Sequence, residues 1–111
     1  MLPYSPYILK GNMLFISGQL GVDENNNLVS ENHLEQFKKA LENLENILQK
    51  NGFSKEDVVK TTVFITSEEY FPKINEEFLK FFDKHKPTRT TIIIKALPKN
   101  AKVEIEAIAM K

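Results

Sequence analysis

Cysteine is absent from this chain of 111 residues. Its absence excludes disulfides, thiolate nucleophiles and zinc sites built on sulfur ligands. An excess of charge is absent too, because 15 Lys and Arg residues balance 15 Asp and Glu residues. This balance argues against nucleic acid or an anionic membrane as the main partner, since both select for basic surfaces. No apolar run approaches the length of a membrane span.

Histidine is scarce and gives no metal-ligand spacing. His33 and His85 lie far apart in the sequence, and we predict that both are surface residues. Strand-like sequence follows directly after Pro3 and Pro6, so we expect no signal or transit peptide. Together with the lack of cysteine, this predicts a cytoplasmic protein, and the missing ligand spacing predicts no metal site.

The composition that remains is that of an ordinary globular protein, with 41% hydrophobic and 27% charged residues. Its length favours one domain over residues 1–111. A chain this short buries a smaller fraction of its surface than a large protein does. Packing against other subunits would therefore help to stabilise it.

Apolar periodicity predicts an α+β domain of order ββαβαββ, with both helices on one face of the sheet. Asn32 with Glu35 resembles a capping box at the start of the first helix, and Gly52 suits its end. Pro72 is tolerable in the first turn of the second helix. The predicted strands cover residues 7–9, 13–17, 58–65, 90–97 and 102–110, and the predicted helices are centred on residues 34–48 and 71–82.

The last predicted strand carries apolar residues on both faces. Val103, Ile105, Ala107 and Ala109 form one face. The other face is half apolar and consists of Glu104, Glu106, Ile108 and Met110. Helices can cover only one side of so small a sheet. The other side therefore predicts contact with another subunit, although a loop folded over it is the alternative.

Several short motifs are spread along the chain: LPYSP at 2–6, GN at 11–12, ISGQ at 16–19, KTTVF at 60–64, IN at 74–75, PTR at 87–89, LPK at 97–99 and VEIEA at 103–107. In residue and spacing, this set resembles the motifs of the RidA/YjgF family, small enzymes that hydrolyse reactive enamines and imines. The resemblance covers nearly the whole chain without large gaps.

The resemblance implies a chorismate-mutase-like mixed sheet, a homotrimer, and a cleft between each pair of subunits. It also implies a 2-iminobutanoate/2-iminopropanoate deaminase that binds imino and keto acids and requires no cofactor, with Arg89 and Glu104 as catalytic residues. The matching substrate-binding positions are Tyr4, Ser17, Gly18, Asn75 and Thr91. Thr91 stands where many active members have Cys, and it would act through its backbone carbonyl.

The chemistry of imine hydrolysis fits Arg89 and Glu104. Arg89 is the only Arg in the chain, and a guanidinium binds a carboxylate through two parallel hydrogen bonds that Lys cannot reproduce. Glu104 can orient the attacking water or take its proton. A surface Arg and a solvated Glu are the plainer alternatives. Among the other charged and aromatic residues, we predict Phe78, Phe81 and Phe82 in the core, Glu106 at the rim, and Lys95, Lys99 and Lys102 in solvent.

Three other functions stay open. The first is a non-catalytic trimer that binds or senses a small molecule, because some members of the family that this chain resembles lack activity. A ribonuclease is disfavoured by the neutral charge and the lack of paired histidines. A chorismate mutase rests on fold analogy alone, and its dicarboxylate substrate would need several cationic side chains.

Overall fold

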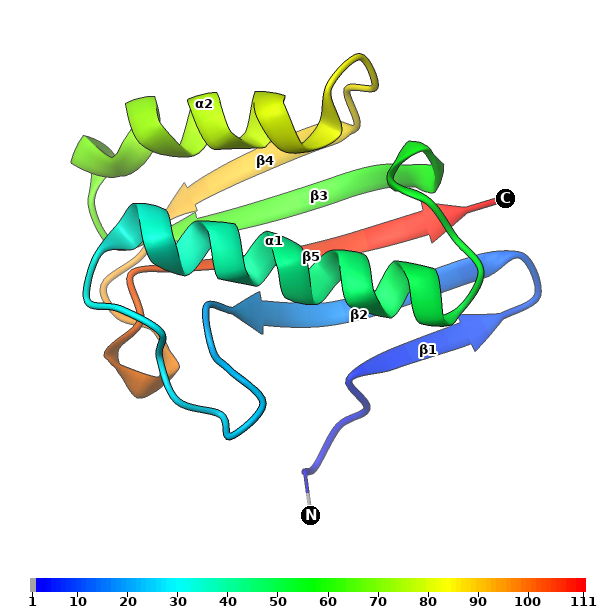
Figure 1. Ribbon diagram of the computed structural model, residues 1–111, viewed down its shortest axis with the longest axis horizontal. Helices are drawn as coiled ribbons and strands as arrows, with labels where there is room; N and C mark the ends of the chain where they lie inside the picture. The colour runs from blue at the N-terminus through cyan, green and yellow to red at the C-terminus, as the bar shows by residue number, and fades with distance from the viewer. Residues whose placement is uncertain (1) are drawn as a thin grey trace.

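The computed structural model describes residues 2–111 as a mixed sheet with two helices on one face (Figure 1). The strands are β1 (Tyr7–Lys10), β2 (Met13–Leu20), β3 (Val58–Ile65), β4 (Thr88–Ile93) and β5 (Val103–Met110), and the helices are α1 (His33–Lys50) and α2 (Phe71–Phe82). The predicted α+β class, the order of the elements and the placement of both helices are confirmed.

The sheet has the strand order β1-β2-β5-β3-β4. Helix α2 connects β3 to β4, which run parallel, and the other neighbouring strands are antiparallel. The last strand, β5, is inserted between β2 and β3. Strands β4 and β5 are therefore not a hairpin but are separated by β3.

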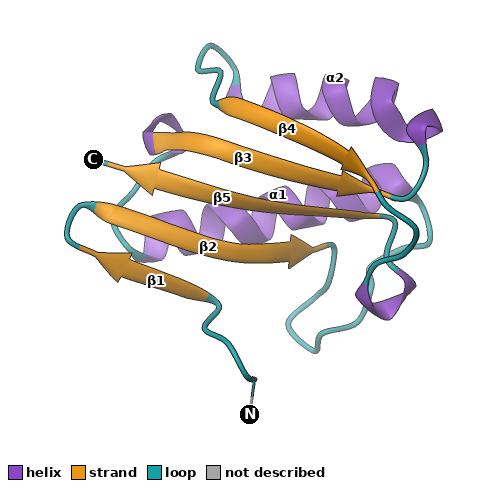
Figure 2. Ribbon diagram, turned by 180° about the vertical axis from the view of Figure 1, so that it is seen from behind, coloured by secondary structure: helices purple, strands orange, loops and turns teal. Residues whose placement is uncertain are grey.

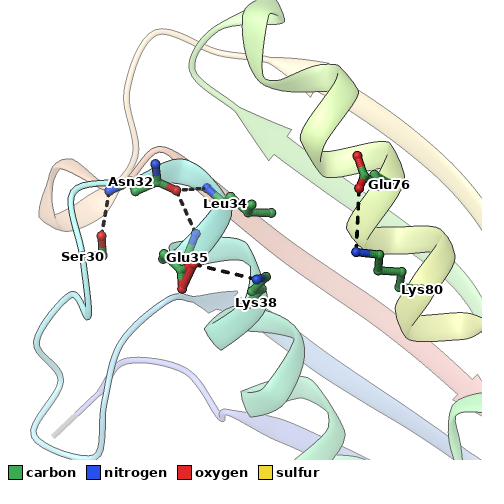
Figure 3. A network of polar contacts seen from close by, with 7 residues as sticks. All are labelled: Ser30, Asn32, Leu34, Glu35, Lys38, Glu76 and Lys80. Atoms are coloured by element: carbon green, nitrogen blue, oxygen red, sulfur yellow. Dashed lines mark hydrogen bonds and ion pairs between the residues drawn. The ribbon is translucent and has the colours of Figure 1, made fainter.

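Helix α1 begins at a side-chain cap, shown in Figure 3. Asn32 Oδ1 accepts from the backbone N–H groups of Leu34 at 2.9 Å and Glu35 at 3.1 Å. The second hydrogen bond of the predicted capping box, from the Asn32 N–H to the Glu35 side chain, is not formed, so this part of the prediction is wrong. Ser30 Oγ accepts from the Asn32 N–H instead, and the Glu35 carboxylate lies 3.8 Å from Lys38 Nζ. Gly52 follows the helix with a φ of +78°, which confirms its predicted role in ending α1.

Two strands differ from their predicted ranges by more than one residue. Strand β4 covers Thr88–Ile93 rather than 90–97, because it pairs along β3 and β3 ends at Ile65. Strand β2 continues to Leu20, three residues beyond the predicted end, because β5 provides backbone partners for Gln19 and Leu20. In both cases a neighbouring strand decides where the pairing stops.

The core lies between the helices and the sheet. Val103, Ile105, Ala107 and Ala109 face the helices and are at most 4% exposed, which confirms the predicted split of the last strand. The aromatic cluster of α2 is also partly as predicted: Phe78 and Phe82 are buried, whereas Phe81 is half-buried against the core.

The prediction that both histidines are surface residues is wrong. The His33 ring stacks on Tyr70 with 4.1 Å between centroids, and its Nε2 is buried without a hydrogen-bond partner in the described structure. Burial, followed by the nearby Lys102 and Lys73, lowers the pKa of His33. His85 Nε2 lies 2.6 Å from the Val58 carbonyl oxygen. Both contacts come from distant segments, which neighbours in the sequence do not reveal.

The predicted solvent-exposed lysines are only partly confirmed. Lys95 and Lys99 are exposed, but Lys102 is half-buried and its Nζ contacts the Glu31 carbonyl oxygen. The backbone N–H of Lys102 also donates to Gln36 Oε1, so this residue ties the start of β5 to α1.

The opposite face of the sheet carries no helix, as Figure 2 shows from behind. Pairing places Ile8, Phe15 and Ile108 side by side on this face. Ile8, Phe15, Ile92 and Met110 are between 40% and 53% exposed. A monomer rarely leaves so many large apolar side chains together in water.

Candidate functional site

Arg89 is held at the outer edge of the sheet by two side chains of α2. Its Nη2 donates to Asn75 Oδ1 at 2.6 Å, and its guanidinium carbon lies 4.9 Å from the Phe78 ring centroid. Asn75 and Phe78 are three residues apart, so they share one face of the helix. The ring and the amide oxygen hold the guanidinium in place, and most of its five donors have no partner among residues 2–111.

The surroundings of Arg89 make it a partly desolvated cation. Burial lowers the pKa of the Arg89 guanidinium, which nonetheless stays protonated because an Arg does not lose its proton in proteins. Thr91 follows two residues later on the same face of β4 and is half-buried. We call Arg89, Asn75, Phe78 and Thr91 the arginine half-site.

Glu104 lies in the middle of the sheet, on the face without helices. It pairs with Phe64 of β3 on one side and with Leu20 of β2 on the other. Its side chain is half-buried, and this burial, with a smaller contribution from Glu106, raises the pKa of Glu104. A carboxylate with a raised pKa is a stronger base than a free one.

Gly18 makes room for that carboxylate. A Cβ built on Gly18 would lie 2.6 Å from Glu104 Cδ and 2.8 Å and 2.9 Å from its two oxygens. Between Ile16 and Gln19 the pairing of β2 with β5 shifts register, which is where Ser17 and Gly18 stand. This irregularity brings the backbone of residue 18 directly beside the Glu104 carboxylate.

Tyr4 and Ser17 lie on the same side of the molecule as Glu104. They line a cavity of about 390 Å³ that Lys60 and Glu106 also line. Ser17 Oγ donates to the Ser5 carbonyl oxygen at 2.7 Å, which fastens the segment before β1 to β2. Glu106, predicted as a rim charge, is exposed and borders this cavity. Gly18 and Glu104 are not among the residues that line this cavity. We call the four predicted positions on this face, Tyr4, Ser17, Gly18 and Glu104, the glutamate half-site.

The two half-sites lie on opposite faces of one sheet. Phe64 pairs with Glu104 on one side and with Ile92 on the other, and Arg89 lies three residues before Ile92. An odd offset along a strand reverses the face. The offset also separates the two positions by about 10 Å along the strands and about 9–10 Å across them. One chain therefore does not bring Arg89 and Glu104 onto one small molecule.

Sequence reasoning missed the role of Phe78, which was assigned to the core alone. The ring is buried, but it also carries the guanidinium of Arg89. The only available signal was its spacing from Asn75. Among residues 2–111, no group of three or more His, Asp and Glu side chains could hold a metal ion. None of the described helices is long and apolar enough to cross a membrane.

Comparison with known proteins gives this architecture a family. The family model described as Endoribonuclease L-PSP matches residues 1–111. A RutC family protein of Pyrococcus horikoshii is 40% identical over 98% of this chain and 87% of its own length. Reactive Intermediate Deaminase A, chloroplastic, of Arabidopsis thaliana is 41% identical over 96% of this chain and 58% of its own length.

Solved structures agree with this assignment. The crystal structure of E. coli TdcF with bound serine has a TM-score of 0.93 and 38% identity, and the match covers 100% of this chain and 90% of that chain. The strand order, the helices on one face and these similarities together show that the chain is a member of the RidA/YjgF family.

Proposed function

We propose that this protein hydrolyses 2-imino acids and their enamine tautomers, of the 2-iminobutanoate and 2-iminopropanoate type, to 2-keto acids and ammonia. The observation that carries the proposal is the pair of half-sites: a fixed guanidinium for a carboxylate, and a half-buried carboxylate with a raised pKa. The relative named Reactive Intermediate Deaminase A supports the class of reaction. The proposed reaction requires no cofactor.

The proposed mechanism needs positioning more than reactive groups. Arg89 binds the substrate carboxylate through two hydrogen bonds, and the Thr91 carbonyl accepts a hydrogen bond from the substrate nitrogen. Glu104 takes a proton from a water as the water oxygen adds to the iminium carbon, and the C=N electron pair moves to nitrogen. Glu104 returns that proton to the nitrogen and then takes the hydroxyl proton of the adduct as the C=O bond forms and the C–N bond breaks. The departing ammonia takes up this last proton, so the products are the keto acid and an ammonium ion, and Glu104 is again ionised.

The remaining positions close the site in this proposal. The Tyr4 hydroxyl covers the substrate, and Ser17 and Gly18 present their backbone to it. Asn75 acts through Arg89, because its Oδ1 already accepts from the guanidinium. Asn75 is therefore a positioning residue in this scheme and does not touch the substrate.

The protein has to assemble for this chemistry, and we propose a homotrimer. The exposed apolar residues of the open face need cover, and the two half-sites need partners from other subunits. Light scattering at micromolar concentration should give a mass near three chains of 12.8 kDa each. A mass of one chain under these conditions contradicts the trimer.

Hydrolysis is tested with freshly generated 2-iminobutanoate. The wild-type protein should accelerate its decay to 2-ketobutyrate, and Arg89→Ala and Glu104→Ala should not. A trimer that only binds small molecules is the second candidate, because the E. coli TdcF structure holds a serine. Such a protein would bind 2-ketobutyrate and leave the decay of the imine unchanged.

RNA cleavage is a weaker candidate, although the family model carries an endoribonuclease name. The chain has no net charge. His33 is stacked on Tyr70 and His85 contacts the Val58 carbonyl, so neither offers a free catalytic imidazole. Cleavage of a labelled RNA by the purified protein at a rate above that of imine hydrolysis would reverse this order.

Replacement of Arg89 by Lys should lower kcat/KM for 2-iminobutanoate about ten- to hundredfold, the equivalent of roughly 1.5–3 kcal/mol for a charged hydrogen bond. The positive charge remains, but an ammonium has neither the paired donors nor the plane that stacks on Phe78. Steady-state kinetics measure kcat/KM, and thermal unfolding shows whether the fold is intact. The matched control, Lys80→Arg on the exposed surface of α2, should change neither. Near-normal turnover of Arg89→Lys would contradict the role assigned to Arg89.

Glu106 should influence how kcat/KM varies with pH. Glu104 must be ionised to act as a base, and its raised pKa moves the acid limb of the kcat/KM profile to higher pH. The substitution Glu106→Gln removes the second cause of that shift, so the limb should move to lower pH. Burial is the larger cause and remains, so the shift should be only partial. The control Glu76→Gln on α2 should leave the limb in place, and an unmoved limb in Glu106→Gln contradicts the coupling.

A further inference from the structure

A second cavity opens beside Arg89, between α2 and the start of β4. Its volume is about 420 Å³, within the usual range for small-molecule sites. It is lined by Asn75, Phe78, Leu79 and Phe82 of α2, by His85 and Lys86 of the following loop, and by Arg89. The mechanism above uses only Arg89, with Asn75 and Phe78 that hold it, and leaves the rest of the cavity without a role.

The lining has the chemistry of a site for an anion with a large apolar group. Phe78, Leu79 and Phe82 form an apolar wall, and Leu79 is 54% exposed, although it is a large hydrophobic residue. Lys86 and Arg89 supply positive charge, and no acidic side chain lines the cavity. A carboxylate bound to Arg89 therefore has apolar surface next to it rather than water alone.

The geometry of a 2-imino acid determines which part of the substrate meets this wall. Its carboxylate and its side chain are attached to the same carbon, so the side chain starts within two bonds of the group that Arg89 holds. The imine carbon has to face the Glu104 carboxylate of another subunit. The remaining direction for the side chain is the cavity beside Phe78.

We propose that this cavity receives the substrate side chain, and that the preferred substrates are 2-imino acids with branched aliphatic or aromatic side chains. This inference rests on the proposed function and names its substrate class. A methyl or ethyl side chain would leave most of the cavity empty. Larger side chains bury more apolar surface against Phe78, Leu79 and Phe82.

The test uses stable product keto acids with the assembled wild-type protein. Pyruvate, 4-methyl-2-oxopentanoate and phenylpyruvate share the carboxylate and the keto group but differ in the side chain. Each fully buried methylene should tighten binding about fourfold, so both larger acids should bind at least tenfold more tightly than pyruvate in calorimetric titrations. Equal affinities for the three acids would overturn the proposal.

A filled cavity supplies the second measurement. Leu79→Trp places a larger side chain at a position where the wild-type residue is exposed, so the fold should tolerate it. The ratio of affinities between 4-methyl-2-oxopentanoate and pyruvate should then fall towards one. The matched control, Lys80→Trp, adds the same bulk one residue later outside the lining and should keep the ratio. An unchanged ratio of the two affinities in Leu79→Trp would show that the substrate side chain binds outside this cavity.

Hydrolysis of the matching imines separates this inference from the proposed function. An amino acid oxidase can generate the imines of alanine, leucine and phenylalanine in the assay. A protein that prefers the larger keto acids but leaves all three imines untouched supports the cavity assignment and refutes the deaminase. A protein that hydrolyses all three imines at equal kcat/KM refutes the cavity assignment and supports the deaminase.

Discussion

Equal amounts of inactive Arg89→Ala and Glu104→Ala proteins, denatured together and refolded, should recover about one quarter of the wild-type activity. Each interface of a randomly mixed symmetric trimer then has about one chance in four of joining an intact Arg89 to an intact Glu104. Each variant refolded alone should stay inactive. The measurement is the rate of 2-iminobutanoate hydrolysis at equal total chain concentration, with mixed trimers confirmed by mass.

This result is expected because the sheet separates the two residues within one chain. Arg89 points towards α2, where Asn75 and Phe78 hold it. Glu104 points to the open face, where Gly18 leaves space for its carboxylate. A neighbouring subunit that covers the open face can bring its own Arg89 to this carboxylate, whereas rotation of side chains in one chain cannot.

A second mixture controls for the statistics of refolding. Wild-type protein refolded with an equal amount of the double variant Arg89→Ala/Glu104→Ala should retain about one quarter of the activity if sites are shared, but about half if each chain has its own site. Inactive mixed trimers in the first experiment, together with half activity in the second, would show that both residues serve a single chain.

Replacement of Gly18 by Ala should reduce kcat/KM at least about a hundredfold, the usual minimum for loss of a positioned general base. The three atoms nearest to the new Cβ all belong to the Glu104 carboxylate, at 2.6–2.9 Å. No real Cβ tolerates such a contact, so the flexible carboxylate must move away from its position over the strand. The fold should persist, because the displaced group is the end of a side chain rather than backbone.

The background of Glu104→Ala provides the control for this substitution. With the carboxylate removed, the methyl group at position 18 has space, so Gly18→Ala should cause no further loss of activity and less loss of thermal stability than in the wild-type protein. Such non-additivity is the expected signature of two residues in contact. Near-normal activity of Gly18→Ala in the wild-type background would contradict the position assigned to Glu104.

Local patterns in the sequence were sufficient for most elements of the fold. The helical spacing of Leu34, Phe37 and Leu41 predicted α1, and the β-branched residues of 58–65 predicted β3. Such patterns depend on residues only a few positions apart, so they predict helices and strands before any contact between distant segments is known. The family resemblance added what local patterns lack, namely that the strands form one mixed sheet of the chorismate-mutase type.

Contacts between distant segments were decided only by the tertiary structure. The end of β4 depends on where β3 ends, and the buried ring of His33 depends on Tyr70. The space that Gly18 leaves for Glu104 exists only because β2 and β5 are neighbours. The sequence by itself determined which residue types are available for the chemistry. The register of the paired strands decided the face and depth at which each stands, because a shift of one residue in a strand reverses every side chain.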